Sequence, residues 1–254
     1  MGNVMDEPVL VFALSLLGQS LAVWLGSSLR NRWRGIVDET RDDLAVVQAA
    51  TLTLLALIIG FTFSMAISRY DLRKSYEEAA ANAIGTEYVR AGLLPAADAV
   101  KVQALLRSYL DERIVFYRTR DQRQLPQINV RTAKLQNELW AAVQAPAIAQ
   151  PTPVAALVAA GMNDVLNSQS YVQAAWWNRI PHAAWGLMAT IALCANVLVG
   201  FGAKSPKAKY VVLVLPLVVS MAFLLIADID SPRGGLIRVN PQNLLSLAEA
   251  LRAP

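Results

Sequence analysis

Two groups of residues in this sequence have side chains and spacing that suit ion binding or ion conduction. The first group is the pair of carboxylates Asp228 and Asp230 with the hydroxyl of Ser231, followed by a Pro-Arg-Gly-Gly turn. Such oxygens either cap a helix end or bind a hard cation such as Ca²⁺. Because residues at i and i+2 point apart on a helix, the two carboxylates do not form an acid–base pair. The pattern favours capping or a salt bridge with Arg233 over a cation site.

The second group is a stripe of residues within a long apolar segment. Thr53, Leu57 and Phe61 recur at i, i+4 and i+8, and Ser64 and Ser68 add hydroxyls to the same candidate site. A helix that only anchors a protein in lipid has no need of such hydroxyls, whereas a helix that faces other helices or water does. The stripe is therefore predicted either to pack against a neighbouring helix or to line a water-filled path.

Other catalytic or metal-binding chemistry has little support in the sequence. The chain has one histidine, His182, and one cysteine, Cys194. A metal site needs several such ligands and an activated nucleophile needs a neighbouring base, and the sequence supplies neither. The pair Gly234-Gly235 does not open a helix with a following lysine, so it is no phosphate-binding loop. The formal net charge of +4 is not concentrated in any one segment of the chain. We therefore expect no enzyme, no metal centre and no nucleic-acid binding.

Apolar helices must position the two candidate groups. The chain has 254 residues and is 55% hydrophobic, which is too apolar for an ordinary soluble domain, yet 17% of its residues are charged. Four stretches without Asp, Glu, Lys or Arg are long enough to span a bilayer: residues 8–29, 44–68, 180–203 and 210–227. The predicted organisation is a first transmembrane pair, a helical extramembrane domain, a second transmembrane pair and a C-terminal tail, at residues 1–68, 69–179, 180–227 and 228–254.

The polar segment between the second and third spans is predicted to be helical nearly throughout. Good helix formers carry the second span on to Val89, and Gly92 and Pro95 end that helix. Turns are expected at 124–127 and 146–153, with amphipathic helices between and after them. The predicted fold class is therefore all-α: a polytopic membrane protein with four transmembrane helices and a helical bundle between the second and the third.

At the two candidate sites the sequence resembles the bestrophin anion channels, and more closely the bacterial bestrophin-like domains of unknown function. Gly60-Phe61 followed by Arg69-Tyr70 has the spacing of the bestrophin neck helix, and 228–234 resembles the acidic element after that family's last span. Matched without gaps, the family's three apolar neck positions fall on Thr53, Leu57 and Phe61, of which the threonine departs from the pattern. The calcium-binding aspartate cluster of animal bestrophins is absent, so no cofactor is expected, with Ca²⁺ as the alternative.

The resemblance implies a homo-oligomer, a pentamer in that family, in the bacterial inner membrane, with the helical domain and both termini in the cytoplasm. Basic residues do not decide this orientation, since seven in the short connections compare with six near the opposite span ends. The second span would line a pore for anions such as chloride, and Leu57 and Phe61 would gate it by dewetting. The partners would be further copies of the chain, membrane lipids and anions. The alternative is a non-conducting membrane scaffold or regulatory protein whose helical domain binds a partner or lipid.

Overall fold

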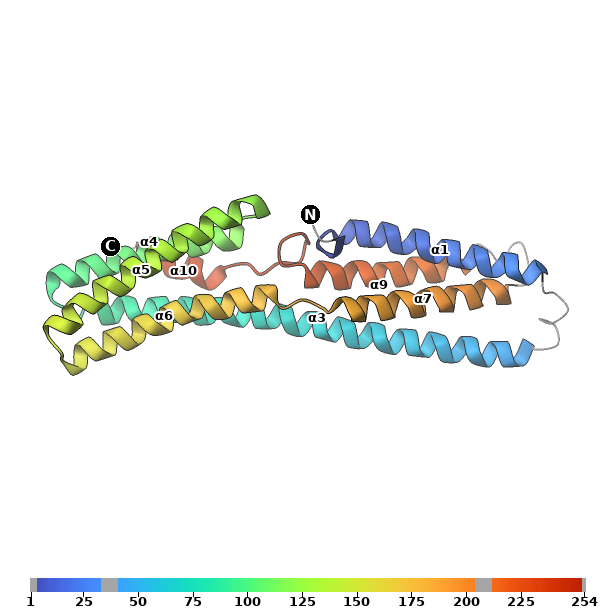
Figure 1. The fold of residues 1–254 in the computed structure, drawn as a ribbon, viewed down its shortest axis with the longest axis horizontal. Helices are drawn as coiled ribbons and strands as arrows, with labels where there is room; N and C mark the ends of the chain where they lie inside the picture. The colour runs from blue at the N-terminus through green and yellow to red at the C-terminus, as the bar shows by residue number, and fades with distance from the viewer. Residues whose placement is uncertain (1–3, 33–40, 204–211, 253–254) are drawn as a thin grey trace. The chain divides into compact units, whose positions relative to one another are not determined.

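The computed structural model describes residues 4–32, 41–203 and 212–252, and in this part of the chain all regular structure is helical. The predicted all-α fold is confirmed for these residues. The elements in chain order are η1 (Val4–Asp6), α1 (Pro8–Arg32), α3 (Arg41–Ala91), α4 (Ala96–Arg118), η2 (Gln122–Gln124), α5 (Leu125–Ala149), α6 (Pro153–Trp177), α7 (His182–Gly202), α9 (Val214–Asp230) and α10 (Gln242–Ala250) (Figure 1).

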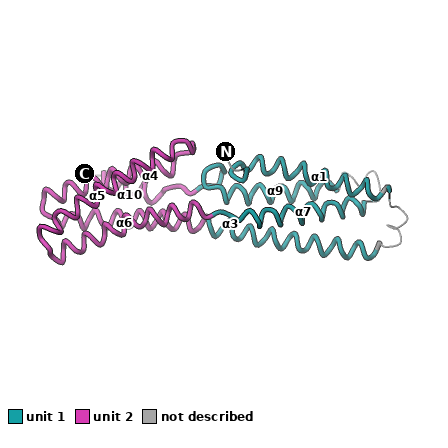
Figure 2. Tube along the Cα trace, in the orientation of Figure 1, with its two compact units in different colours: residues 1–69, 179–238 teal, residues 70–178, 239–254 magenta. Residues whose placement is uncertain are grey.

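The chain divides into two compact units (Figure 2). Unit 1 comprises residues 1–69 and 179–238, and unit 2 comprises residues 70–178 and 239–254. All four predicted spans lie in unit 1. The C-terminal residues predicted as one tail are shared between the units, because α10 packs on helices of unit 2, where Leu244 is fully buried.

Three stretches of the described residues are long and apolar enough to cross a membrane: Pro8–Arg30, Asp42–Ala91 and Pro153–Gly202. The last stretch includes both α6 and the more apolar α7. The fourth predicted span starts at Tyr210, which lies outside the described residues, and its described part, α9, has 17 residues. That length is at the lower limit for a span. The connections 33–40 and 204–211, which carry part of the basic residues counted for orientation, also lie outside the described residues.

Glycines bring α1 and α7 into backbone contact in unit 1. A methyl group on Gly26 would overlap the carbonyl oxygen of Val197, and one on Gly200 would overlap that of Val23. The two helices run parallel, since positions late in α1 meet positions late in α7. Membrane helices, which gain little from burying apolar surface, associate through such close packing of small residues.

Unit 2 is a helical bundle with a continuous apolar core. Helix α3 extends without a break to Ala91, as its lack of helix breakers predicted, and α4 begins directly after Pro95. The predicted turn at 146–153 is shorter than expected, because α5 includes Pro146 and ends at Ala149. Pro146 is buried, and its carbonyl oxygen accepts a hydrogen bond from the N–H of Gln150 at 2.9 Å. The last turn of α5 therefore closes around the proline.

Likewise, the predicted turn at 124–127 is replaced by η2 and the start of α5, with Pro126 in the first helical turn. A proline is well tolerated there because the N–H it lacks would have no partner within the helix. Both prolines lie near an end of α5, as the sequence predicted. The difference is that α5 includes them, whereas the sequence predicted that they would lie in turns.

Candidate functional site

The predicted neck residues lie together on one exposed side of α3. The side chains of Leu57 and Phe61 are 52% and 64% exposed, and Thr53, Ser64 and Ser68 are exposed as well. The Thr53 hydroxyl donates a hydrogen bond to the carbonyl oxygen of Ala49 at 2.9 Å. The donor of this hydroxyl is thus satisfied within the helix, while its lone pairs still face outward.

The opposite side of α3 is the buried one. Leu55, Thr62 and Ala66 have exposed fractions of only 2%, 4% and 0%. At about 100° per residue these positions lie about 140–180° around the helix from Leu57. The chain thus packs one side of α3 against its own helices and leaves the stripe uncovered by the described part of the same chain.

The second candidate group, at the end of α9, is held by Arg179, which lies just before α7. The Asp230 carboxylate accepts a hydrogen bond from Arg179 Nε at 2.9 Å and contacts the N–H of Ile180 at 3.2 Å. Arg179 Nη1 also donates to Asp6 at 2.5 Å. The guanidinium of Arg179 therefore bridges the carboxylate of Asp6, just before α1, and that of Asp230, at the end of α9. Such charge-assisted hydrogen bonds are stronger than neutral ones.

Asp228 closes the turn that follows α9. Its two carboxylate oxygens accept hydrogen bonds from the backbone N–H groups of Leu236 and Ile237 at 2.7 and 2.8 Å. A methyl group on Gly235 would overlap Asp228, so this turn needs a glycine there. The Ser231 hydroxyl accepts a hydrogen bond from the N–H of Gly234 at 3.0 Å. Among the described residues, no group of three or more His, Cys, Asp or Glu side chains is placed to hold a metal ion.

These contacts predict a structural effect for Asp228. Changing Asp228→Asn leaves one oxygen acceptor for two backbone donors, so we expect the free energy of unfolding in detergent to fall by about 1–2 kcal/mol. Glu7→Gln, at an exposed acidic residue of the same unit, should change it little. The free energies are measured by denaturant titration with and without a calcium chelator. If the chelator destabilises the wild type but not Asp228→Asn, Asp228 is a cation ligand instead.

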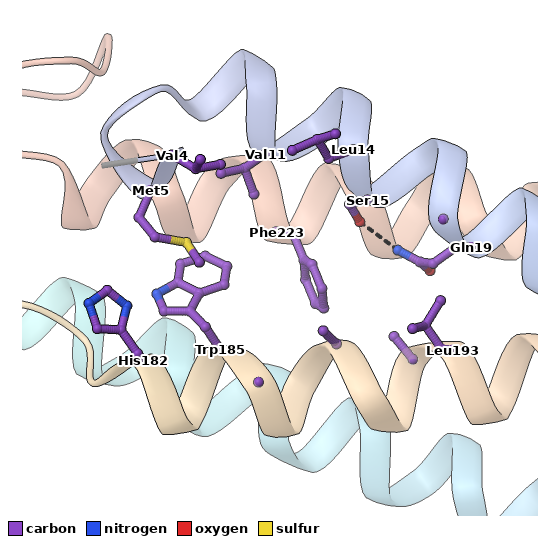
Figure 3. A pocket seen from close by; sticks show the side chains of 14 residues that line it. Val4, Met5, Val11, Leu14, Ser15, Gln19, His182, Trp185, Leu193 and Phe223 are labelled. Carbon is purple, nitrogen blue, oxygen red and sulfur yellow. Dashed lines mark hydrogen bonds between the residues drawn. The ribbon is translucent and has the colours of Figure 1, made fainter. Parts of the chain in front are cut away.

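A buried polar cluster that the sequence reasoning missed joins α1, α7 and α9. Gln19 Nε2 donates to Ser15 Oγ at 2.6 Å (Figure 3) and lies 3.2 Å from Ser220 Oγ. Asn196 Nδ2 donates to Gln19 Oε1 at 3.0 Å. Gln19, Asn196 and Ser220 are at most 2% exposed. The available signal was a single carboxamide in each of two predicted spans, since polar side chains within membranes often bond to each other across helices.

His182 and Cys194 do not join either candidate group. His182 is exposed at the start of α7, where it lines a cavity between α1 and α7. Cys194 is a free, exposed thiol farther along the same helix. Neither belongs to a group of three or more His, Cys, Asp or Glu side chains that could hold a metal ion in the described part of the chain.

Comparisons with known proteins point to one family. A family model described as a Bestrophin-like domain matches residues 13–244. The chain is also similar to the crystal structure of a single-residue variant of a bacterial bestrophin homolog from Klebsiella pneumoniae, with a TM-score of 0.65 and 14% identity over 99% of this chain and 96% of that one. A second variant of that homolog gives a TM-score of 0.63 and 14% identity, over 96% and 97% of the two chains.

A third solved structure, described only as a membrane protein, has a TM-score of 0.61 and 14% identity, over 95% of this chain and 98% of that one. At such identities these likenesses show the fold alone. No curated protein matches the chain.

Proposed function

Because the chain belongs to the bestrophin-like family, we propose that it is an oligomeric channel of the bacterial inner membrane that conducts anions, chloride among them. The observation that carries this proposal is the exposed stripe on α3 opposite the buried side of that helix. Copies of α3 around a common axis would bring the stripe of every copy to the centre. The resemblance favours five copies.

In the proposed pore Leu57 and Phe61 form an apolar neck that excludes water until it widens. Thr53 replaces an apolar neck residue by one with a hydroxyl, so the ring that it forms is more easily wetted. Ser64 and Ser68 continue the lining towards Arg69 with polar groups. Selectivity for anions comes from helix N-termini and the positive edges of aromatic rings. In this proposal α1, α3, α7 and α9 are the four membrane spans, the helical domain is cytoplasmic, and no residue is assigned a catalytic role.

A thiol in the neck tests conduction and pore lining together. Leu57→Cys in a Cys194→Ser background is reconstituted in vesicles, and chloride efflux is followed with a chloride electrode. We expect efflux above that of protein-free vesicles, and a bulky charged thiol reagent should block most of it. The matched control is Leu21→Cys on α1, which is 62% exposed and should be insensitive to the reagent.

The alternative function is the non-conducting scaffold, which predicts no efflux above background for either variant before the reagent is added. Efflux that the reagent blocks equally at both positions would contradict the assignment of α3 as the pore helix. The uncovered stripe favours the channel, because a scaffold whose α3 faces only lipid gains nothing from three hydroxyl residues on that side.

A further inference from the structure

A cavity of about 420 Å³ lies within unit 1 between α1, α7 and α9. This volume is in the range of sites that bind small ligands. Figure 3 shows α1 on one side of the cavity and α7 on the other, with Phe223 of α9 projecting between them. The walls are mainly apolar side chains, namely Val11, Leu14, Leu193 and Phe223. Ser15 and Gln19 of the polar cluster lie at one end, and His182 at the other.

Trp185 supplies an unused hydrogen-bond donor to this cavity. Its side chain is 5% exposed and packs edge to face against Phe223, with 6.1 Å between ring centroids. The indole Nε1 is buried and has no hydrogen-bond partner in the described part of the chain. In Figure 3 this nitrogen is directed towards the end of the cavity where His182 lies. Leaving such a donor without an acceptor destabilises the folded protein.

The chemistry of the walls restricts what can satisfy this donor. Water needs two to four polar partners, but the Ser15 and Gln19 side chains at the far end already bond to one another and to α9. A mostly hydrocarbon molecule with one carbonyl oxygen matches the site better, because its chain meets the apolar walls and its carbonyl meets the indole N–H.

The position of the donor along α7 identifies the source of that carbonyl. Trp185 lies one turn after the start of α7, and Trp177 and Arg179 immediately precede that helix. Tryptophan and arginine at the end of an apolar helix are typical of a membrane interface, the depth at which the ester groups of glycerolipids lie. The cavity extends from there along α7 towards Leu193, which is the direction of an acyl chain.

We propose that this cavity binds one acyl chain of a membrane glycerophospholipid, whose ester carbonyl accepts a hydrogen bond from Trp185 Nε1. The lipid fills the space between α1, α7 and α9 as part of the folded protein. This site is separate from the stripe on α3, so the proposal does not depend on whether the protein conducts ions.

The test uses phosphatidylglycerol with a photoactivatable diazirine on one acyl chain, added to the purified full-length protein, and maps the labelled residues by mass spectrometry. Label on Val11 and Phe223 reports the cavity, because both side chains line it and are only 7% and 4% exposed. We expect Trp185→Phe to weaken this labelling about fivefold, the effect of one neutral hydrogen bond. Trp177→Phe, at a tryptophan that is 75% exposed, should leave it unchanged.

Two further measurements test the proposal if Trp185→Phe folds poorly. Ala189→Phe places a ring in the cavity and should abolish label on Val11 and Phe223. A diazirine hydrocarbon of equal length without the ester should label the wild type several-fold less than the lipid does. The proposal is overturned if the two residues stay unlabelled in the wild type, if the ester makes no difference, or if label there is unchanged in both variants.

Discussion

Alanine in place of Phe61 should raise chloride efflux from reconstituted vesicles by about tenfold or more. In the proposed neck every copy contributes one phenyl ring to the apolar constriction, and the ring is 64% exposed in the single chain. Exposing a phenylalanine side chain to water costs about 1.5–3 kcal/mol. Removing the ring lowers the cost of wetting the constriction by a similar amount for each copy, and each 1.4 kcal/mol corresponds to a factor of ten.

The opposite substitution should have the opposite effect. Thr53→Leu completes the apolar pattern of the neck and should reduce efflux below that of the wild type, because a leucine side chain is harder to wet than a threonine hydroxyl. The two substitutions lie on one side of one helix and preserve its helical propensity to within a few tenths of a kcal/mol. A change of protein stability alone would not move efflux in opposite directions.

Phe63→Ala is the matched control on the same helix. Phe63 carries the same phenyl ring as Phe61 but is only partly exposed and lies about 120° around α3 from Leu57, outside the stripe. We expect its efflux to equal that of the wild type. Equal efflux from Phe61→Ala, Thr53→Leu and Phe63→Ala would contradict a neck at this position, whatever the wild-type rate.

Much of the helical fold follows from local sequence signals. Helix α3 extends from the second span into unit 2 because residues 68–89 lack proline and are rich in good helix formers, and Gly92 with Pro95 ends it where predicted. The end of α5 was less predictable. Pro146 lies inside the last turn of α5 and is buried, and its burial depends on tertiary packing, which the local sequence does not specify.

The periodicity of the sequence could not predict which residues contact each other within the candidate sites. Asp230 bonds to Arg179, which lies 51 positions earlier in the chain, and Gln19 bonds to Asn196 at a separation of 177 positions. The sequence predicted Arg233 as the salt-bridge partner at this turn, whereas the fold brings Arg179 to Asp230 and Asn196 to Gln19. The stripe on α3 was different, because residues on one side of a single helix are fixed by helical geometry alone.

Glu87 is the clearest case of chemistry that only the fold creates. It lies on α3 in unit 2 and is fully buried, and neither carboxyl oxygen has a hydrogen-bond partner in the described part of the chain. A methyl group on Gly161 of α6 would overlap this carboxyl group. Burial raises the pKa of Glu87 from 4.5 to about 8, with Arg90 lowering it and Asp164 raising it. At neutral pH the folded protein therefore keeps Glu87 mostly protonated.

This pKa predicts that the protein loses stability as the pH rises. The folded state binds the proton of Glu87 more tightly than the unfolded chain, so its contribution is complete below about pH 4.5 and is lost progressively up to about pH 8. The loss amounts to about 3–5 kcal/mol, since each pKa unit is worth about 1.4 kcal/mol. Glutamine has the shape of the protonated side chain and does not titrate. Glu87→Gln should therefore match the wild type at pH 4.5 and exceed its free energy of unfolding by about 3–5 kcal/mol at pH 9.

The measurement is the difference in unfolding free energy between variant and wild type at each pH, so that titrations common to both cancel. Glu78→Gln, at an exposed glutamate of the same helix, should show a difference that stays near zero at every pH. A Glu87→Gln difference that is equally flat would show that the carboxyl group ionises freely in the folded protein. Because α3 also carries the stripe, chloride efflux of Glu87→Gln at pH 6 and pH 9 then shows whether ionisation of this residue reaches the proposed pore. A wild type whose efflux changes with pH while the variant's does not would place a proton-sensitive group on the pore helix itself.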